Sequence, residues 1–157
     1  MESKDRHHPI HLASKEKFNR PTIVFVTVCT DKRKPILANE ISLKVILDAW
    51  KKAAGWSVGR YAILPDHIHF FCSPSFDAPR LKRWITYWKS EVSRNWPTPD
   101  QHPIWQRDFW DRQLRTGESY DSKWIYVYNN PVRHGLVAKP EDWPYSGKVA
   151  NLEWLGP

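Results

Sequence analysis

Cysteine is scarce in this 157-residue chain, which contains only Cys29 and Cys72. Both lie in apolar, strand-like runs, and neither belongs to a paired metal-ligand spacing. This scarcity argues against a disulfide framework and favours a reducing compartment. We therefore expect a cytoplasmic protein.

The amino terminus lacks a long hydrophobic run. The first 20 residues are charged and include His7, His8 and His11. Such a segment is expected to be neither a signal peptide nor a membrane anchor, so no membrane partner is expected. We predict a flexible basic arm over residues 1–20 and one domain over residues 21–157, long enough to bury a core. The three histidines are more typical of an arm than of a metal site.

Positive charge is in excess, with 24 Lys and Arg against 17 Asp and Glu and a formal net charge of +7. This balance suits a polyanionic partner such as nucleic acid. Ten tryptophans are also present. Indole rings can stack on unpaired bases as well as fill a core, and we expect most of them to be core residues.

Four segments have the composition of β-strands. Residues 22–30 are dense in β-branched side chains, which is typical of a strand partly buried on both faces. Residues 56–64 and 67–73 are predicted as two strands of an antiparallel hairpin, and the later part of 105–115 as a fourth strand.

Two amphipathic segments lie between these strands. Asn39 precedes apolar residues at helical spacing, and Gly55 is placed to end that helix. After Asp77, a second helix has an apolar stripe and a basic outer surface. The order β-α-β-β-α-β predicts an α+β fold class, with two helices on one face of a ferredoxin-like antiparallel sheet.

A further helix is predicted from Ser119 to Asn130, stopped by Pro131. Its periodicity puts one group of side chains in an apolar arc: Tyr120, Trp124, Ile125, Val127 and Tyr128. Tyr126 falls on the opposite, polar side. A solvated surface tyrosine would fit this position as well as a functional one.

His67 and His69 are one residue apart in an otherwise apolar strand. Alternate side chains on a strand share a face, so both imidazoles are expected to project together, where they could hold one divalent metal ion. A pair of hydrogen-bonded strand histidines is the structural alternative. A tyrosine hydroxyl is a poor nucleophile at neutral pH, but a metal ion on a scissile phosphate would permit its in-line attack.

The chain resembles the REP-associated tyrosine transposases within the single-tyrosine HUH nuclease superfamily, which are related to the smallest bacterial insertion-sequence transposases. The resemblance runs from about residue 20 to residue 147 and rests on four blocks in the family's order: Leu64–His69 (LPDHIH), Ile104–Asp111 (IWQRDFWD), Tyr126–Val137 (YVYNNPVRHGLV) and Asp142–Ser146 (DWPYS).

The resemblance implies that Tyr126 is the nucleophile, that His67 and His69 are metal ligands, and that Asn130 is a third ligand one helical turn after the tyrosine. It further implies Mg²⁺ or Mn²⁺ as cofactor, no small-molecule cofactor, and cleavage and transfer of single-stranded DNA that carries a REP-like hairpin, close to the bacterial nucleoid. Candidate DNA contacts come from charge alone: Lys15, Lys17, Arg20, Arg80, Arg83 and Lys89.

Three alternatives compete with this interpretation. A rolling-circle replication initiator would share the chemistry, but the chain shows no helicase or origin-binding domain. A domesticated hairpin-binding module would not need the intact His67, His69 and Tyr126. A ferredoxin-like RNA-binding domain would show an Arg-Gly-Phe-Gly-Phe string, which is absent.

Overall fold

The computed structural model describes residues 22–115 and 117–152. The predicted arm over residues 1–20, with Lys15, Lys17 and Arg20, lies outside these ranges. The strands are β1 (Val24–Thr30), β2 (Trp56–Leu64), β3 (His67–Pro74), β4 (Trp105–Gln113) and β5 (Ser146–Lys148). The α-helices are α1 (Glu40–Lys52), α2 (Leu81–Arg94), α3 (Gly117–Tyr128) and α4 (Asn130–Arg133), with short 3-10 turns at Asp31–Arg33, Pro99–Gln101 and Pro140–Asp142.

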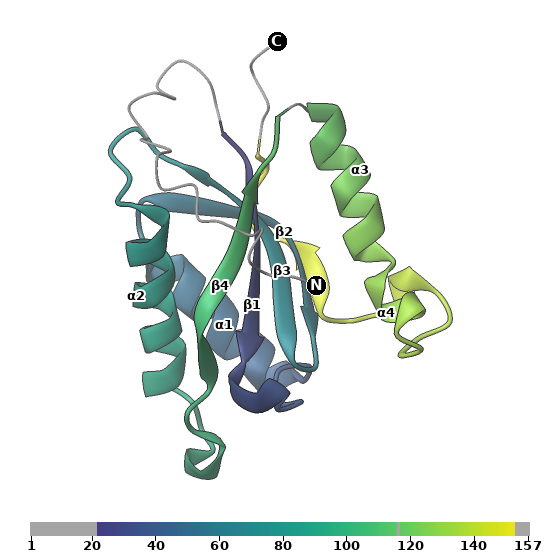
Figure 1. Ribbon diagram of the computed structural model, residues 1–157. Coiled ribbons are helices and arrows are strands. Elements are labelled where there is room, and N and C mark those ends of the chain that lie inside the picture. Colours follow the sequence, from purple (N-terminus) through teal and green to yellow (C-terminus); the bar gives the residue numbers. More distant parts are fainter. Residues whose placement is uncertain (1–21, 116, 153–157) are drawn as a thin grey trace.

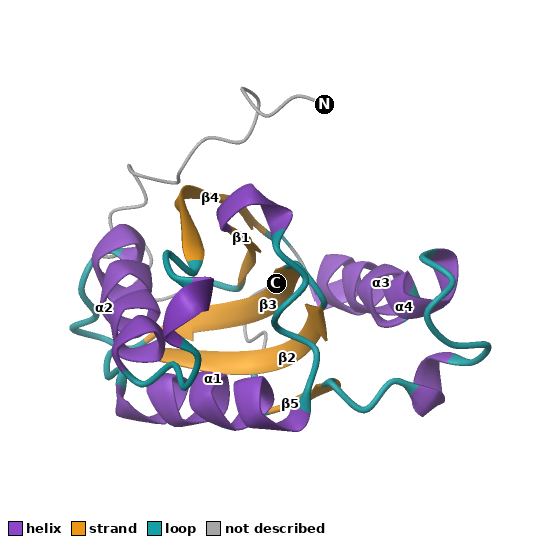
Figure 2. Ribbon diagram, turned by 90° about the horizontal axis from the view of Figure 1, so that it is seen from below, coloured by secondary structure: helices purple, strands orange, loops and turns teal. Residues whose placement is uncertain are grey.

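The strands form one antiparallel sheet in the order β4-β1-β3-β2-β5. The first four strands have the ferredoxin-like order that the sequence predicts, so the α+β fold class is confirmed. The helices α1 and α2 cover one face of the sheet, and α3 lies on the other (Figures 1 and 2). Among the described residues, no helix has the length and apolar character needed to span a bilayer.

Strand alternation divides the apolar side chains between two cores. Val24, Val26 and Val28 face α1 and α2, whereas Ile23 belongs to the core beneath α3. Eight of the ten tryptophans lie in or against these cores, as expected: Trp50, Trp84, Trp88 and Trp96 in the first, with Trp56 and Trp105 against it, and Trp124 and Trp143 against the second. Cys29 and Cys72 are both buried thiols.

The first predicted helix, α1, begins and ends close to its expected positions. Asn39 caps α1, because its side-chain oxygen accepts a hydrogen bond from the Ser42 amide at 2.9 Å. The helix ends at Lys52, three residues before Gly55, which lies in the turn into β2. Its φ is +104°, and a Cβ there would lie 2.5 Å from Pro79 Cδ.

The predicted helix over 119–130 is wrong at its carboxyl end. It begins at Gly117 and stops at Tyr128, and a separate short helix starts at Asn130. Pro131 lies in the first turn of α4, where a missing amide costs nothing. Ile125, which the periodicity placed at the edge of the apolar arc, is also 61% exposed, because Tyr120 and Val127 make the buried contacts.

The strand β5 was not predicted. Its three residues, Ser146–Lys148, contain no β-branched or aromatic side chain, so they carry no strand signal of their own. Pairing with the edge of β2 holds the segment in place, with Arg60 opposite Lys148 and Ala62 opposite Ser146. Gly147 lies against the Tyr61 ring, and a Cβ there would be 2.7 Å from the Tyr61 hydroxyl oxygen.

Asp111 is an acidic residue buried on β4. Its side chain is 6% exposed, and within the described part of the chain neither carboxylate oxygen has a hydrogen-bond partner. Burial raises the pKa of Asp111 from 3.8 to about 7. The folded protein therefore keeps a proton on this carboxyl that the unfolded chain has already released at pH 5 to 6.

Asp111 is expected to reduce stability as pH rises from about 4 to about 7, because the raised pKa makes the folded state bind more protons than the unfolded state in that window. Asp111→Asn should remove this dependence of the free energy of unfolding on pH. The variant should exceed wild type at pH 8 by on the order of 2 kcal/mol, less than the roughly 4 kcal/mol of full linkage because a buried amide also lacks partners. Urea unfolding at pH 5 and pH 8 measures the difference.

The difference in unfolding free energy between Asp111→Asn and wild type reports on Asp111 alone, because the other titrating groups are the same in both proteins. His67 and His69 have lowered pKa values and contribute a slope of the opposite sign, which cancels in the difference. Asp108→Asn is the matched control, because Asp108 is exposed on the same strand. Parallel pH profiles for Asp111→Asn and wild type would contradict the expectation.

Candidate active site

His67 and His69 project from β3 toward the face of the sheet that α3 covers. Their ring centroids are 4.7 Å apart, and the ring planes meet at 77°. Phe71, two residues further along the same face, contacts Tyr120 and Trp124 of α3. The structure therefore brings the two imidazoles side by side, as strand alternation predicts, beneath the helix that carries Tyr126.

Each imidazole is held through its Nδ1 atom. His67 Nδ1 lies 2.8 Å from Asp66 Oδ1, and His69 Nδ1 lies 2.9 Å from Thr27 Oγ1 on the neighbouring strand. Across the described ranges, neither Nε2 atom makes a hydrogen bond. This pattern resembles metal-binding histidines, in which one ring nitrogen is fixed by a polar neighbour and the other is the ligand.

Burial lowers the pKa of His67, and the nearby Arg33 adds to this effect while Asp66 opposes it. Burial also holds the pKa of His69 well below its usual value, with the charges of His67 and Lys123 adding to it. Both rings are therefore neutral at pH 7. A neutral imidazole is the form that binds a metal ion.

Tyr126 is 57% exposed on α3, so its predicted position on the polar side of the helix is confirmed. Two cations lie close to its ring: Arg133 Cζ lies 3.7 Å from the ring centroid, and Lys123 Nζ lies 5.4 Å from it. Lys123 Nζ is also 4.7 Å from the Phe25 ring, which stacks on His69 at 5.3 Å. These contacts connect the tyrosine to the histidine pair.

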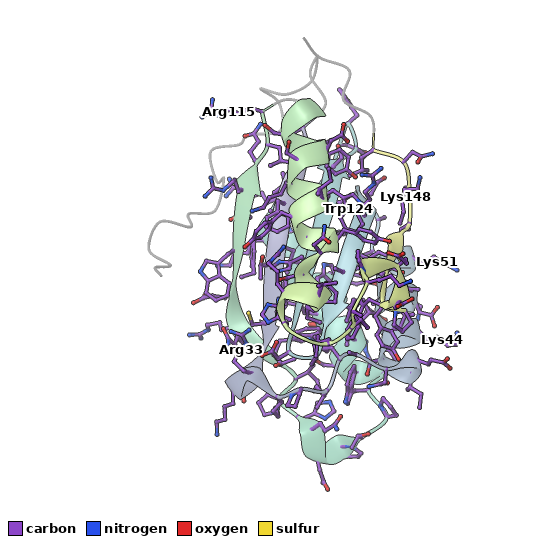
Figure 3. The ribbon with its side chains drawn as sticks, turned by 90° about the vertical axis from the view of Figure 1, so that its right-hand side faces the viewer. Arg33, Lys44, Lys51, Arg115, Trp124 and Lys148 are labelled. Carbon is purple, nitrogen blue, oxygen red and sulfur yellow. The ribbon has the colours of Figure 1, made fainter. Side chains whose placement is uncertain are left out.

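The short helix α4 approaches the same place from the other end. The His134 ring at its end lies 6.2 Å from the His67 ring. Arg133 Nη2 donates to the Tyr126 carbonyl at 2.7 Å and to Asn130 Oδ1 at 3.1 Å. Figure 3 views the molecule from the α3 side, with α3 in front of the sheet and Trp124 labelled on it.

Asn130 occupies a position different from the expected one. It is buried, 6% exposed, and begins α4 instead of continuing α3. Its Oδ1 atom accepts from Arg133 and keeps a second lone pair. Its role as a third ligand stays a prediction.

His67 and His69 are the candidate nitrogen ligands for a divalent ion at this site. Considering only the part of the chain that the structure describes, no three His, Cys, Asp or Glu side chains are grouped to hold a metal. The two imidazoles fit such an ion as a pair, because both are neutral, held at Nδ1 and open at Nε2. The remaining ligands would be oxygens, from Asn130, water or phosphate.

Of the predicted DNA contacts, Arg83 and Lys89 belong to α2 and Arg80 is its N-cap residue. The helix α2 covers the sheet face opposite α3 (Figure 1). Arg80 and Arg83 are exposed there. Lys89 is instead partly buried, and its Nζ donates to the Gln106 carbonyl at 2.7 Å, tying α2 to β4. Burial lowers the pKa of Lys89 to about 8. All three assignments stay predictions, and the ammonium of Lys89 already has an internal partner.

Sequence reasoning missed several members of the site. Thr27, Lys123 and Arg133 contact the predicted residues, and Asp66 orients His67. Asp66 and Arg133 lie inside the recognised blocks, so the blocks gave a signal for them. No sequence signal pointed to Thr27, because its hydrogen bond with His69 joins residues 42 positions apart.

No family model matches the chain. Two curated relatives do. A Haemophilus influenzae protein assigned to the REP-associated tyrosine transposases is 34% identical over 95 residues, 54% of this chain and 54% of the relative. The REP-associated tyrosine transposase of Escherichia coli is 27% identical over 128 residues, 80% of this chain and 74% of the relative. The chain is similar to the REP-associated tyrosine transposases.

The match to the Haemophilus transposase spans about half the length of that relative. Solved structures support the fold. A REP-associated tyrosine transposase bound to a REP hairpin superimposes with a TM-score of 0.69 at 21% identity, over 93% of this chain and 82% of that chain. A Deinococcus radiodurans protein assigned as a transposase superimposes with a TM-score of 0.51 at 14% identity. That match covers 69% of this chain and 90% of the Deinococcus chain.

Proposed function

We propose that this protein is a REP-associated tyrosine transposase, that is, a metal-dependent single-strand DNA endonuclease and strand transferase that acts beside REP-like hairpins. The observation that supports it best is that the two imidazoles on β3 and the exposed Tyr126 on α3 lie on one face of the sheet, linked through Phe25 and Lys123. A neutral histidine pair and a tyrosine are the groups that this chemistry needs.

In this proposal His67 and His69 would hold a divalent ion through Nε2, and Asn130 would supply an oxygen. When bound, the ion would draw charge from the scissile phosphate. The Tyr126 hydroxyl oxygen attacks phosphorus as the bond to the 3′-oxygen breaks; the phenol loses its proton and the released 3′-oxygen gains one. The product is a 5′-phosphotyrosine, and a second 3′-hydroxyl can reverse the step.

Lys123 and Arg133 have a separate role in this proposal. Both place positive charge against the Tyr126 ring, at 5.4 and 3.7 Å from its centroid. A phosphate that reaches the tyrosine must pass close to these cations. They therefore neutralise part of its charge and orient it for attack.

The test is incubation with an end-labelled single strand that carries a hairpin and an unpaired flank, in the presence of Mg²⁺ or Mn²⁺. We expect a covalent adduct on a denaturing gel, with the label retained when it is 3′ of the cut. The same strand fully paired in a duplex is the matched control and should react far more slowly, because its bases are not splayed. Hairpin binding with no adduct would favour a domesticated binding module.

Binding should weaken steeply with salt, because the chain's positive charge would release counterions from the strand. We expect affinity for the hairpin strand to fall at least about 30-fold between roughly 50 and 200 mM salt. Fluorescence anisotropy at four salt concentrations measures the slope. A flat dependence would contradict recognition through phosphates.

A further inference from the structure

The turn that follows β1 has an unusual backbone. Lys32 has φ of +55° and ψ of +24°, and Arg33 has φ of +53°. Side chains other than glycine rarely adopt this left-handed region, and two in succession cost conformational free energy. Such strain persists only where surrounding contacts enforce it, so the contacts of this turn are informative.

The turn is bound to the hairpin turn that precedes His67. The Thr30 amide donates to the Asp66 carbonyl at 3.0 Å, and the Leu37 amide donates to the Pro65 carbonyl at 2.9 Å. These bonds hold the two turns together. They also bring Arg33 against Asp66 near one end of the sheet, where Figure 3 labels it.

Both oxygens of the Asp66 carboxylate are engaged. Oδ2 accepts from Arg33 Nε at 3.1 Å, and Oδ1 lies 2.8 Å from His67 Nδ1. Arg33 Nη2 is 3.4 Å from the same Nδ1. The shorter contact decides the proton's place: a carboxylate only accepts, so Nδ1 must carry the hydrogen and Nε2 the lone pair.

We propose that Arg33 is a positioning residue, which fixes the Asp66 carboxylate so that it holds His67 in the tautomer with Nε2 open. The strained turn is what brings the guanidinium to this carboxylate. The metal-binding consequence rests on the proposed function; the tautomer itself does not. Thr27 contacts His69 Nδ1 as Asp66 contacts His67 Nδ1, but its hydroxyl carries no charge.

The burial of the pair distinguishes this role from a stabilising ion pair. The Arg33 side chain is 52% exposed and that of Asp66 is 29% exposed. Ion pairs at such sites contribute little to folding. Loss of Arg33 should therefore leave unfolding nearly unchanged while altering the state of the His67 ring.

The experiment is a two-bond proton–nitrogen correlation spectrum of the full chain labelled with ¹⁵N-histidine, free of metal and DNA, at pH 8. His67→Gln identifies the His67 signals. Wild type should show His67 with hydrogen on Nδ1. Arg33→Ala should shift it toward a mixture of tautomers, Asp66→Ala should shift it further, and Arg33→Lys should partly restore it. Lys32→Ala, which changes the neighbouring strained residue, is the matched control.

Mn²⁺ affinity is the second measurement, by electron paramagnetic resonance without DNA. We expect Asp66→Ala to weaken it about 10- to 100-fold and Arg33→Ala by a smaller factor, with Lys32→Ala unchanged. A wild-type tautomer in Arg33→Ala would overturn the proposal. Absence of Mn²⁺ binding to wild type would instead count against the proposed metal site, and the tautomer spectra would still decide the role of Arg33.

Discussion

Tyr126→Phe is expected to eliminate the covalent DNA adduct, by at least about 1,000-fold, because it removes the attacking oxygen and leaves the ring. The ring keeps its contacts with Lys123 and Arg133, and the hydroxyl of a side chain that is 57% exposed contributes little to folding. Hairpin affinity and the free energy of unfolding should therefore stay within about 0.5 kcal/mol of wild type. Denaturing gels and urea unfolding measure both.

Two other tyrosines serve as controls for this result. Tyr128 is half-buried on the same helix, with its ring 5.4 Å from Trp124, and Tyr87 is 45% exposed on α2 across the sheet. Both Phe variants should form the adduct at close to the wild-type rate. Adduct formation that survives in Tyr126→Phe and disappears in Tyr128→Phe would transfer the nucleophile's role to Tyr128.

The parts of the fold that could be predicted are those with a periodic apolar pattern. β1 is buried on the face toward α1 and α2 and partly buried on the face toward α3, and its β-branched composition indicated a strand of this kind. β5 could not be predicted, because Ser146–Lys148 gains its conformation from the edge of β2. The break between α3 and α4 also escaped prediction, since a proline can end a helix or begin one.

In the candidate site, too, local sequence patterns predicted some residues, whereas others depend on contacts between distant parts of the chain. Strand alternation alone placed His67 and His69 together, and helical periodicity alone placed Tyr126 toward solvent. The contact between Thr27 and His69 depends on the register of β1 against β3, which no local pattern contains. For Lys89, charge alone predicted an exposed DNA contact. Its position beside β4 instead lets its ammonium donate to the Gln106 carbonyl.

Replacing His67 and His69 together by alanine should abolish Mn²⁺ binding, with affinity reduced by roughly 100-fold or more, and adduct formation with it. Hairpin binding should persist, because phosphate and base contacts lie on other residues. Mn²⁺ should also bind wild type more tightly than Mg²⁺, since imidazole nitrogen suits the harder Mg²⁺ ion poorly. Calorimetric titration with each ion and anisotropy with the hairpin strand separate these effects.

The double variant should also unfold more easily than wild type. The expected loss in the free energy of unfolding is larger than at an exposed metal-binding face, because both imidazoles make internal contacts. His67 is only 7% exposed and bonded to Asp66, and His69 stacks on Phe25, so a loss of about 1 to 3 kcal/mol is expected. His134→Ala is the matched control, because its ring lies 6.2 Å from His67 without belonging to the pair. Equal loss of Mn²⁺ affinity in His134→Ala, or unaltered affinity in the folded double variant, would place the metal elsewhere and leave Tyr126 without the charge that its attack on a phosphodiester requires.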